Sequence, residues 1–311
     1  MHLGQIPLRT PNMKLRLFRA FAIVFLILSL LNPKTSVAGA SAGLVLWFQT
    51  IVPTLLPFII LSNILVSSGC VKYFRRLLAP LISGIFHKSG SCAYAVVVGL
   101  LCGYPMGAKA AADLVESGQI SKKEGQWLIS FCNLPSPMFL IGFVAVNHIA
   151  AAVYLPVLVL ALLSGGFYKT STEETKKPLL EQTPKKAPTL MYIFESSIMD
   201  GLELIAKIGG YIILFSILSA YIQTVPFAHQ LPKGILLGTI EITTGIHYAS
   251  GMACSAKLKA ILCTGISVFG GCSGLAQTNS VMNKAGFSLL HYTGWKLCHV
   301  LLSCVLMYFL W

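Results

Sequence analysis

Charged residues are scarce in this sequence. Aspartate, glutamate, lysine and arginine together make up 11% of its 311 residues, against roughly 25% in ordinary soluble domains. Apolar residues make up 55%, and the mean hydropathy is +0.76. This composition excludes an ordinary soluble domain. It predicts an all-α, polytopic membrane protein whose first partner is the lipid bilayer.

Acidic residues are scarcer than basic ones. The chain has 10 Asp and Glu against 23 Lys and Arg, which gives a formal net charge of +13. In a soluble chain this balance would suggest a nucleic-acid partner. In a membrane protein the excess of lysine and arginine in cytoplasmic loops explains it. We therefore expect no nucleic-acid partner.

Motifs for metals, cofactors and catalysis are also missing. The nine cysteines lie mostly inside apolar runs, without the paired spacing of a zinc site or a disulfide framework. His291 and His299 have no carboxylates at ligand spacing, which argues against a metal site. No nucleotide-binding loop or hydrolase motif is present. We expect no metal, no cofactor and no enzymatic activity.

Two glycines and a proline interrupt an apolar run after residue 102. Gly103 and Gly107 permit backbone torsions that other residues resist, and Pro105 lacks an amide donor, so a continuous helix is not expected. Broken backbone at membrane depth is tolerated only where protein or water satisfies the freed polar groups. The interruption predicts a binding site of the transporter type, and close packing of small residues is the alternative. The charges of Lys109 and Asp113, which follow directly, favour the binding site.

A second interruption repeats this pattern near residue 270. Gly270 and Gly274 have the same four-residue spacing as the first pair, and the polar residues Gln277 and Asn279 follow them. Glycine-interrupted segments in corresponding positions of two halves are a sequence sign of a transporter site at the interface between the halves.

Apolar runs predict about six membrane-spanning helices. The first has a basic flank and is either a retained helix or a signal peptide with a small-residue cleavage site at 36–38. We favour the retained helix, because a protein with several spans needs no cleaved signal. The predicted spans cover about residues 17–31, 44–66, 126–146, 149–168, 205–225 and 288–310.

A polar loop divides the chain into two halves. This loop is rich in lysine, glutamate and proline, and it is predicted to be solvated. The expected parts are a basic segment with the first helix at 1–40, a first repeat at 41–168, the cytoplasmic loop at 169–190 and a second repeat at 191–311.

The distribution of basic residues predicts the topology. Amphipathic stretches at 70–88 and 234–252 are expected to lie in the membrane interface, and the two interruptions are expected to form re-entrant hairpins. With the N-terminus inside, fifteen lysines and arginines fall on the inner side and four, at 34, 233, 257 and 259, on the outer side. The hairpins then enter from opposite faces. The halves are therefore predicted to be inverted repeats in the cell membrane, with both termini cytoplasmic.

Several segments share their pattern with a known family, over about residues 44–300. They lie at 47–58, 103–109, 130–133 with 137–139, 208–216, 241–245 and 270–277. These segments resemble the sporulation integral membrane protein YlbJ family. The resemblance implies a Gate (nucleoside recognition) domain, which also occurs in concentrative nucleoside transporters and ferrous-iron transporters, and an association with endospore formation. The chain departs from the family at Cys132, Leu134 and Cys272, where the family has small polar residues.

We predict that the two interruptions meet near the bilayer midplane, because hairpins that enter from opposite faces bring their tips together. The leading hypothesis is a secondary transporter for a small polar solute, either facilitative or coupled to an ion. The competing hypothesis is a membrane scaffold needed for sporulation. The oligomeric state stays open. The predicted substrate-binding residues are Gly103, Tyr104, Gly107, Lys109, Asn133, Gly270, Gly271, Ser273, Gly274, Gln277 and Asn279.

Each polar residue of this set also has a structural interpretation. Lys109 beside a helix amide end would favour an anionic solute, whereas pairing with Asp113 would make a neutral solute equally acceptable. Asn133 and the polar residues after Gly274 would otherwise form interhelical hydrogen bonds. Glu241 is either a proton or cation site or a helix-capping or surface carboxylate.

Overall fold

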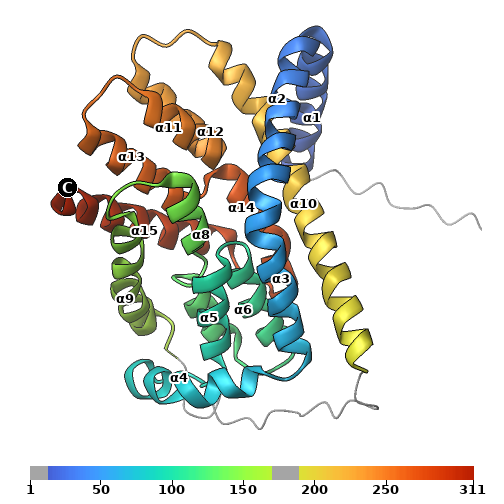
Figure 1. The fold of residues 1–311 in the computed structure, drawn as a ribbon, viewed down its shortest axis with the longest axis vertical. Helices are drawn as coiled ribbons and strands as arrows, with labels where there is room; N and C mark the ends of the chain where they lie inside the picture. The colour runs from blue at the N-terminus through green and yellow to red at the C-terminus, as the bar shows by residue number, and fades with distance from the viewer. Residues whose placement is uncertain (1–12, 170–188) are drawn as a thin grey trace, which may run out of the picture.

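Helices are the only regular secondary structure in the described part of the chain. The computed structural model describes residues 13–169 and 189–311, and no strand occurs in these two ranges (Figure 1). The basic residues before Met13 and most of the predicted loop at 169–190 lie outside the described residues. The all-α expectation is confirmed for the described ranges.

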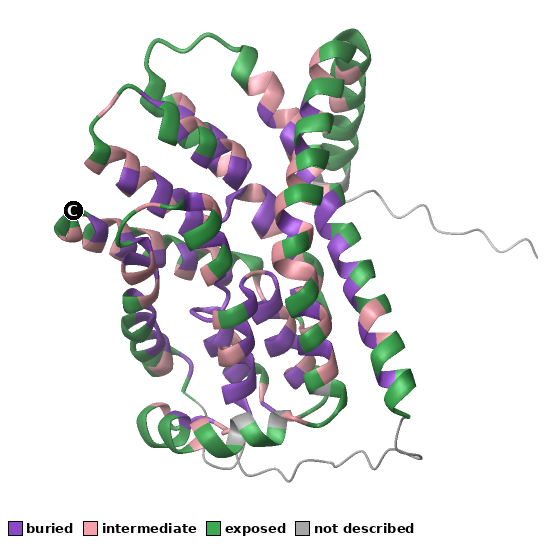
Figure 2. Cartoon of the chain, viewed as in Figure 1, coloured by how far each residue is buried: buried purple, intermediate pink, exposed green. Residues whose placement is uncertain are grey.

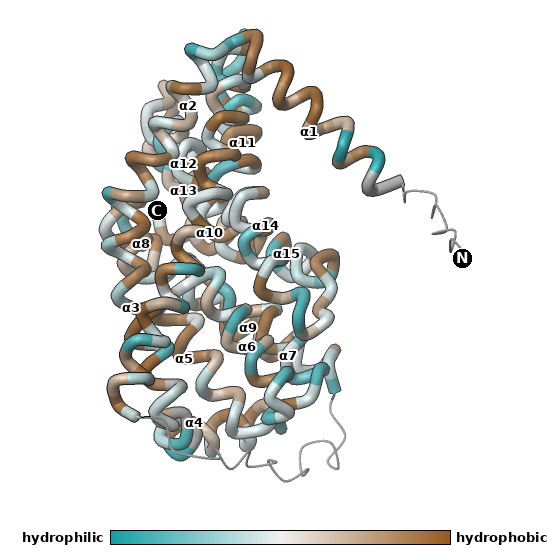
Figure 3. The backbone as a smooth tube through the Cα atoms, turned by 90° about the vertical axis from the view of Figure 1, so that its right-hand side faces the viewer, coloured by the Kyte–Doolittle hydropathy of each residue, from teal (hydrophilic) through white to brown (hydrophobic). Residues whose placement is uncertain are grey.

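Five described segments are long and apolar enough to cross a membrane. Helix α1 (Met13–Leu31) is not one of them, because its first two turns carry Lys14, Arg16 and Arg19, although the rest of it is apolar (Figure 3). The chain is therefore a multi-pass helical membrane protein with five candidate spans in the described ranges. They are Pro33–Leu65, Ile149–Phe167, Leu190–Thr224, Ala256–Ala285 and Leu289–Leu310.

The first candidate span contains a π-helical turn close to its prolines. Helix α2 (Pro33–Leu46) leads through a π-helical turn, η1 (Trp47–Ile51), into α3 (Val52–Ser67). The turn directly precedes Pro53, and π-turns and prolines are the usual causes of a kink. The predicted span at 44–66 therefore belongs to a longer helical segment.

Glycines bring α2 close to α10 (Leu190–Thr224), which includes the predicted span at 205–225. A Cβ on Gly39 would lie 2.8 Å from Ile217 Cα, and one on Gly43 would lie 2.9 Å from Ile213 Cα. Small residues at this spacing let two membrane helices pack closely. Figure 1 shows α2 and α10 side by side.

Helix α4 (Val71–Phe86) matches the amphipathic stretch predicted at 70–88. It lies across one end of the bundle in Figure 1. Leu77, Leu81 and Ile85 follow one another at four-residue spacing and are exposed, so they form an apolar stripe on one face. This stripe is typical of a helix that lies in the membrane interface.

The first interruption forms a helical hairpin, in which α5 (Cys92–Cys102) packs against α6 (Met106–Glu116). The predicted span at 126–146 is wrong as one helix. After α7 (Lys122–Ile129) the backbone is irregular over 130–136, and helix resumes only in the short pieces α8 (Pro137–Phe139) and η2 (Leu140–Val144). The two prolines at 135 and 137 remove amide donors and disfavour a helix before them.

In the second half, the hairpin forms at a different place from the one predicted. The expected interfacial helix at 234–252 is instead a hairpin of α11 (Gln230–Ile240) and α12 (Ile242–Gly251). The helices α13 (Ala256–Phe269) and α14 (Gly271–Met282) do not pack side by side but continue one candidate span. The second glycine interruption therefore breaks a helix without forming the predicted hairpin. In Figure 1 the α5–α6 hairpin lies in the lower half and the α11–α12 hairpin in the upper half.

This correction moves the C-terminus. Helix α15 (Leu289–Leu310) matches the predicted last span and packs against α13. The Lys257 Nζ atom lies 3.6 Å from the centre of the Tyr308 ring, so the end of α15 lies beside the start of α13. Residue 257 and the C-terminus therefore lie on the same side. The prediction that placed residue 257 outside and the C-terminus inside is wrong in separating them.

Burial is concentrated between the hairpins. Figure 2 shows buried residues along α5, α6 and α14 and exposed residues along the outer faces of α1, α9 (Ile149–Phe167) and α10. Trp127 and Leu128 of α7 are fully buried. The apolar outer face suits a lipid environment, and the interior holds the broken segments that lipid would not tolerate.

Candidate functional site

The interruption at Gly103 and the irregular segment 130–136, which is a second interruption in the first half, hold each other in place. The backbone N–H of Tyr104, between α5 and α6, donates to the carbonyl oxygen of Leu134 in the irregular segment 130–136, at 2.6 Å. Gly103 adopts a φ of +80°, and a Cβ on it would lie 2.6 Å from the Ser136 nitrogen. Only glycine fits this contact.

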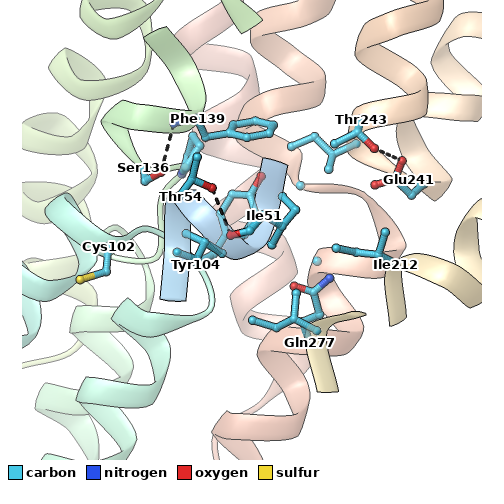
Figure 4. Close-up of a pocket in the computed structure, with 16 residues that line it drawn as sticks. Ile51, Thr54, Cys102, Tyr104, Ser136, Phe139, Ile212, Glu241, Thr243 and Gln277 are labelled. Atoms are coloured by element: carbon cyan, nitrogen blue, oxygen red, sulfur yellow. Dashed lines mark hydrogen bonds between the residues drawn. The ribbon is translucent and has the colours of Figure 1, made fainter. Parts of the chain in front are cut away.

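The other two interruptions, at Glu241 and Gly270, lie against each other in the second half. A Cβ on Gly271 would lie 3.3 Å from Glu241 Cα. Tyr104 connects the two halves, because its ring lies 3.6 Å from the position of a Cβ on Gly270 and 3.9 Å from that on Gly274. Four interruptions, two from each half, thus meet at the centre of the fold (Figure 4).

A small cavity lies between these interruptions (Figure 4). Its volume is about 40 Å³, which is room for a few water molecules at roughly 10–15 Å³ each. Six separate parts of the chain line it. The lining residues are Ile51, Thr54, Leu55, Cys102, Tyr104, Pro135, Ser136, Phe139, Ile208, Ile212, Glu241, Ile242, Thr243, Gly270, Gly274 and Gln277. We call it the central cavity.

The predicted glycines divide into two groups. Gly270 and Gly274 line the central cavity. Gly103 and Gly107 do not line it, and a Cβ on Gly107 would lie 2.3 Å from the Cys132 carbonyl oxygen. Close packing through small residues, the alternative for this stretch, is therefore what the structure shows at Gly107.

Asn133 is fully engaged by protein and does not line the central cavity. Its side-chain oxygen accepts from the backbone N–H of Ala108 at 3.2 Å. Its amide nitrogen donates to Thr278 Oγ1 at 3.1 Å and to the Tyr292 hydroxyl at 2.7 Å. The structural interpretation, interhelical hydrogen bonding, therefore describes the contacts of Asn133.

The buried Lys296 joins the two broken segments. Its ammonium donates to the carbonyl oxygens of Asn133, at 2.6 Å, and Val268, at 3.0 Å, and lies 5.2 Å from the centre of the Tyr104 ring. The predicted site omitted Lys296. The available signal was a lone lysine in an apolar helix, because intramembrane charges usually mark functional positions.

Of the predicted polar residues on α14, only Gln277 lines the cavity. Its Nε2 atom donates to the hydroxyl of Ser273, at 3.0 Å, and Ser273 itself is buried. Asn279 is half-buried and lies outside the central cavity. The helix turns Thr278, rather than Asn279, toward Asn133.

Lys109 lies outside the central cavity. Its ammonium forms an ion pair with Asp113 at 2.8 Å, and both side chains are partly exposed. A screened surface pair of this kind contributes little to stability. The two residues line a separate cavity of about 480 Å³ between α6, α10 and α14, which we call the outer cavity. Asp113 therefore neutralises Lys109, and the argument for an anionic solute from Lys109 no longer applies.

Glu241 is the one carboxylate among the residues that line the central cavity, and the predicted site did not include it. It is fully buried, and its Oε2 atom accepts from the Thr244 N–H at 2.8 Å and from the hydroxyl of Thr243. Oε2 thus caps the N-terminus of α12, as one of the two interpretations of Glu241 predicted. The other oxygen, Oε1, is buried without a hydrogen-bond partner in the described structure.

Comparison with known proteins agrees with the resemblance. The chain is 27% identical to the sporulation integral membrane protein YlbJ of Bacillus subtilis (strain 168) over an alignment of 321 positions, which covers 90% of this chain and 78% of that protein. No family model matches the chain. No solved structure matches it either.

Proposed function

We propose that this multi-pass membrane protein, similar to the sporulation integral membrane protein YlbJ, moves a small polar solute across the cell membrane and serves endospore formation. The observation that carries the proposal is the meeting of four helix interruptions around the central cavity. Broken helices at membrane depth are typical of transporters, because their ends supply unpaired backbone groups to a solute.

The arrangement of the hairpins supports two inverted repeats of the Gate type. Each half contains a helical hairpin, then a broken helical segment, then a long helix, α9 in the first half and α15 in the second. The hairpins lie on opposite sides of the centre in Figure 1. In transporters built from such repeats, the halves move against each other around a fixed central site.

The outer cavity supports a pathway to the centre. It is lined by charged residues of α6 and α10 and by Ser280 and Val281 of α14, and both α10 and α14 also line the central cavity. On α14, Gln277 faces the central cavity and Ser280 faces the outer cavity, less than one turn later. The outer cavity therefore stops about one helical turn short of the central site. A solute larger than a few waters would need movement of these helices.

Uptake into membrane vesicles tests the proposal. Vesicles that contain the chain are expected to accumulate at least one class among nucleosides, amino acids and aromatic dicarboxylate anions faster than empty vesicles. The chain is also expected to restore spore formation in a strain that lacks the related protein. Restored spore formation without uptake of any solute would favour the scaffold function instead.

Gly274→Leu is expected to abolish uptake while the protein stays inserted. A Cβ at this position has room, since its nearest neighbour is the Tyr104 ring at 3.9 Å, but a leucine side chain would fill a cavity of about 40 Å³. The matched control is Gly294→Leu, because Gly294 is exposed on α15 with no neighbouring atom within 4 Å of its Cβ position. Equal uptake by the two variants would refute the central cavity as the solute site.

The topology is tested by labelling single cysteines in a cysteine-free background. We propose that the end of α9 is cytoplasmic, because basic residues concentrate there. Lys169→Cys is then expected to react only from the inside. His229→Cys is expected to react from the outside, because it follows the end of α10, which lies at the top of Figure 1, whereas α9 ends in the lower half. Reaction of residue 169 in intact cells would refute this orientation.

A further inference from the structure

Glu241 occupies the most enclosed position available to an acidic side chain in the described structure. It sits between α11 and α12 and is 0% exposed. It packs against Gly271, which lies about halfway along the candidate span Ala256–Ala285. An ionisable group at that depth is costly unless it is paired, and it usually marks an ion pathway.

The two carboxylate oxygens of Glu241 have different surroundings. Oε2 is occupied by the Thr244 N–H and the Thr243 hydroxyl. Oε1 is buried and has no partner in the described structure, although Glu241 borders the central cavity. Capping of α12 needs only Oε2. Oε1 therefore takes no part in capping the helix.

No basic side chain of the described structure neutralises Glu241, since none lies within 4.0 Å of its carboxylate. The nearby basic residues on α11, α12 and α13 are Lys233, His247, Lys257 and Lys259, and all are at least partly exposed. Lys296 of α15 donates to two backbone carbonyls instead. The other titratable residues that line the cavity, Cys102 and Tyr104, bring no positive charge.

Glu124, a second fully buried glutamate, shows what a purely structural carboxylate looks like here. Its Oε1 accepts from the Ser89 N–H at 2.6 Å, and its Oε2 accepts from the Ser121 N–H at 2.8 Å. Burial lowers the pKa of the neighbouring Lys88 ammonium, and the Glu124 charge partly offsets this. Both oxygens of Glu124 are thus used, and a positive charge is close by.

We infer that Glu241 Oε1 binds a monovalent cation, a sodium ion or a proton, in the central cavity. This inference rests on the proposed transport function and names its coupling ion. A buried unpaired carboxylate is stabilised when a positive charge joins it. The cavity has room for an ion or a few waters, and the polar residues Ser136, Thr243 and Gln277 line it together with Glu241.

Glu241→Gln tests the inference, because glutamine keeps the volume and one oxygen to cap α12. Radioactive sodium binding at fixed alkaline pH tests the sodium arm. The infrared band of a protonated carboxyl group, followed against pH without sodium, tests the proton arm. In Glu241→Gln, either sodium binding is expected to fall to the level of empty detergent micelles, or the infrared band is expected to lose the contribution of one carboxyl group. The same signal is expected to persist in the matched control Glu124→Gln. Persistence of both signals in folded Glu241→Gln would overturn the inference.

A measurement on the unaltered chain removes dependence on folding of the variant. An apolar carbodiimide reacts with buried protonated carboxyl groups, and mass spectrometry locates the modified residue. We expect modification of Glu241 that sodium suppresses at fixed pH, and no sodium-dependent change at any other glutamate. Absence of modification at Glu241 under every condition would overturn the inference. Cation binding at Glu241 without uptake of any solute would instead overturn the proposed transport function alone.

Discussion

Lys296→Met is expected to lower the free energy of unfolding by about 2–6 kcal/mol, from the roughly 1–3 kcal/mol lost for each buried acceptor left without a donor. The substitution keeps the length of the apolar stem but removes the ammonium. The carbonyl oxygens of Asn133 and Val268 would then lose the donor that ties the two broken segments together. Both acceptors belong to interrupted helix, so no neighbouring amide replaces the lysine.

Thermal unfolding in detergent, followed by tryptophan fluorescence, measures this effect. The matched control is Lys284→Met, because Lys284 is exposed on the surface of the outer cavity. The control is expected to change stability by less than about 0.5 kcal/mol, as surface substitutions usually do. An unfolding temperature of Lys296→Met equal to that of the control would show that Lys296 does not hold the two segments together.

Gly99→Ala is expected to cost about 3 kcal/mol or more, at the upper end of what overpacking of a core costs. A Cβ on Gly99 would lie 1.8 Å from the carbonyl oxygen of Cys132. This contact is with backbone, so no side-chain rotation relieves it. The α5 helix and the irregular segment 130–136 would have to separate, and the hydrogen bond from Tyr104 to Leu134 would be strained.

The matched control for this prediction is Gly210→Ala. Gly210 also lies inside a helix, α10, but it is exposed and nothing lies within 4 Å of its Cβ position. Alanine is expected to stabilise that helix by up to about 1 kcal/mol. Yields of folded protein by size-exclusion chromatography and unfolding temperatures compare the two variants. Similar stability for both would contradict the close packing of α5 against residue 132.

Two of the three positions at which the chain departs from the pattern it resembles lie in contacts that the backbone makes. Cys132 contributes its carbonyl oxygen to the contact with Gly99 and Gly107, and Leu134 contributes its carbonyl oxygen to the Tyr104 N–H. Because the backbone makes these contacts, the side chains at 132 and 134 can change without loss of the arrangement. Cys272 is half-buried on α14 and does not line the central cavity.

Local sequence predicted where helices stop but not how the chain continues. Gly103 and Gly270 both adopt positive φ, as their interruptions predicted. A torsion angle does not determine whether two helices pack side by side. In the second half, contact between Gly238 and Gly245 brings α11 and α12 together, since a Cβ on Gly245 would lie 2.2 Å from Gly238 Cα. The hairpin therefore formed at Glu241 and not at Gly270.

The amino-acid sequence by itself determined the helical membrane class, the surface helix α4 and the positions of both glycine interruptions. These follow from the amino-acid composition, from the spacing of apolar residues along the sequence and from the backbone torsions that glycine and proline allow. Only the tertiary structure decided that Lys109 lines the outer cavity and that protein groups occupy the hydrogen-bonding atoms of Asn133. It also decided that Glu241 and Lys296 lie at the centre of the fold. The reason is that Asn133 bonds to Tyr292 and Lys296 bonds to Asn133 across 159 and 163 residues of sequence. Spacing along one helix carries no information about such contacts.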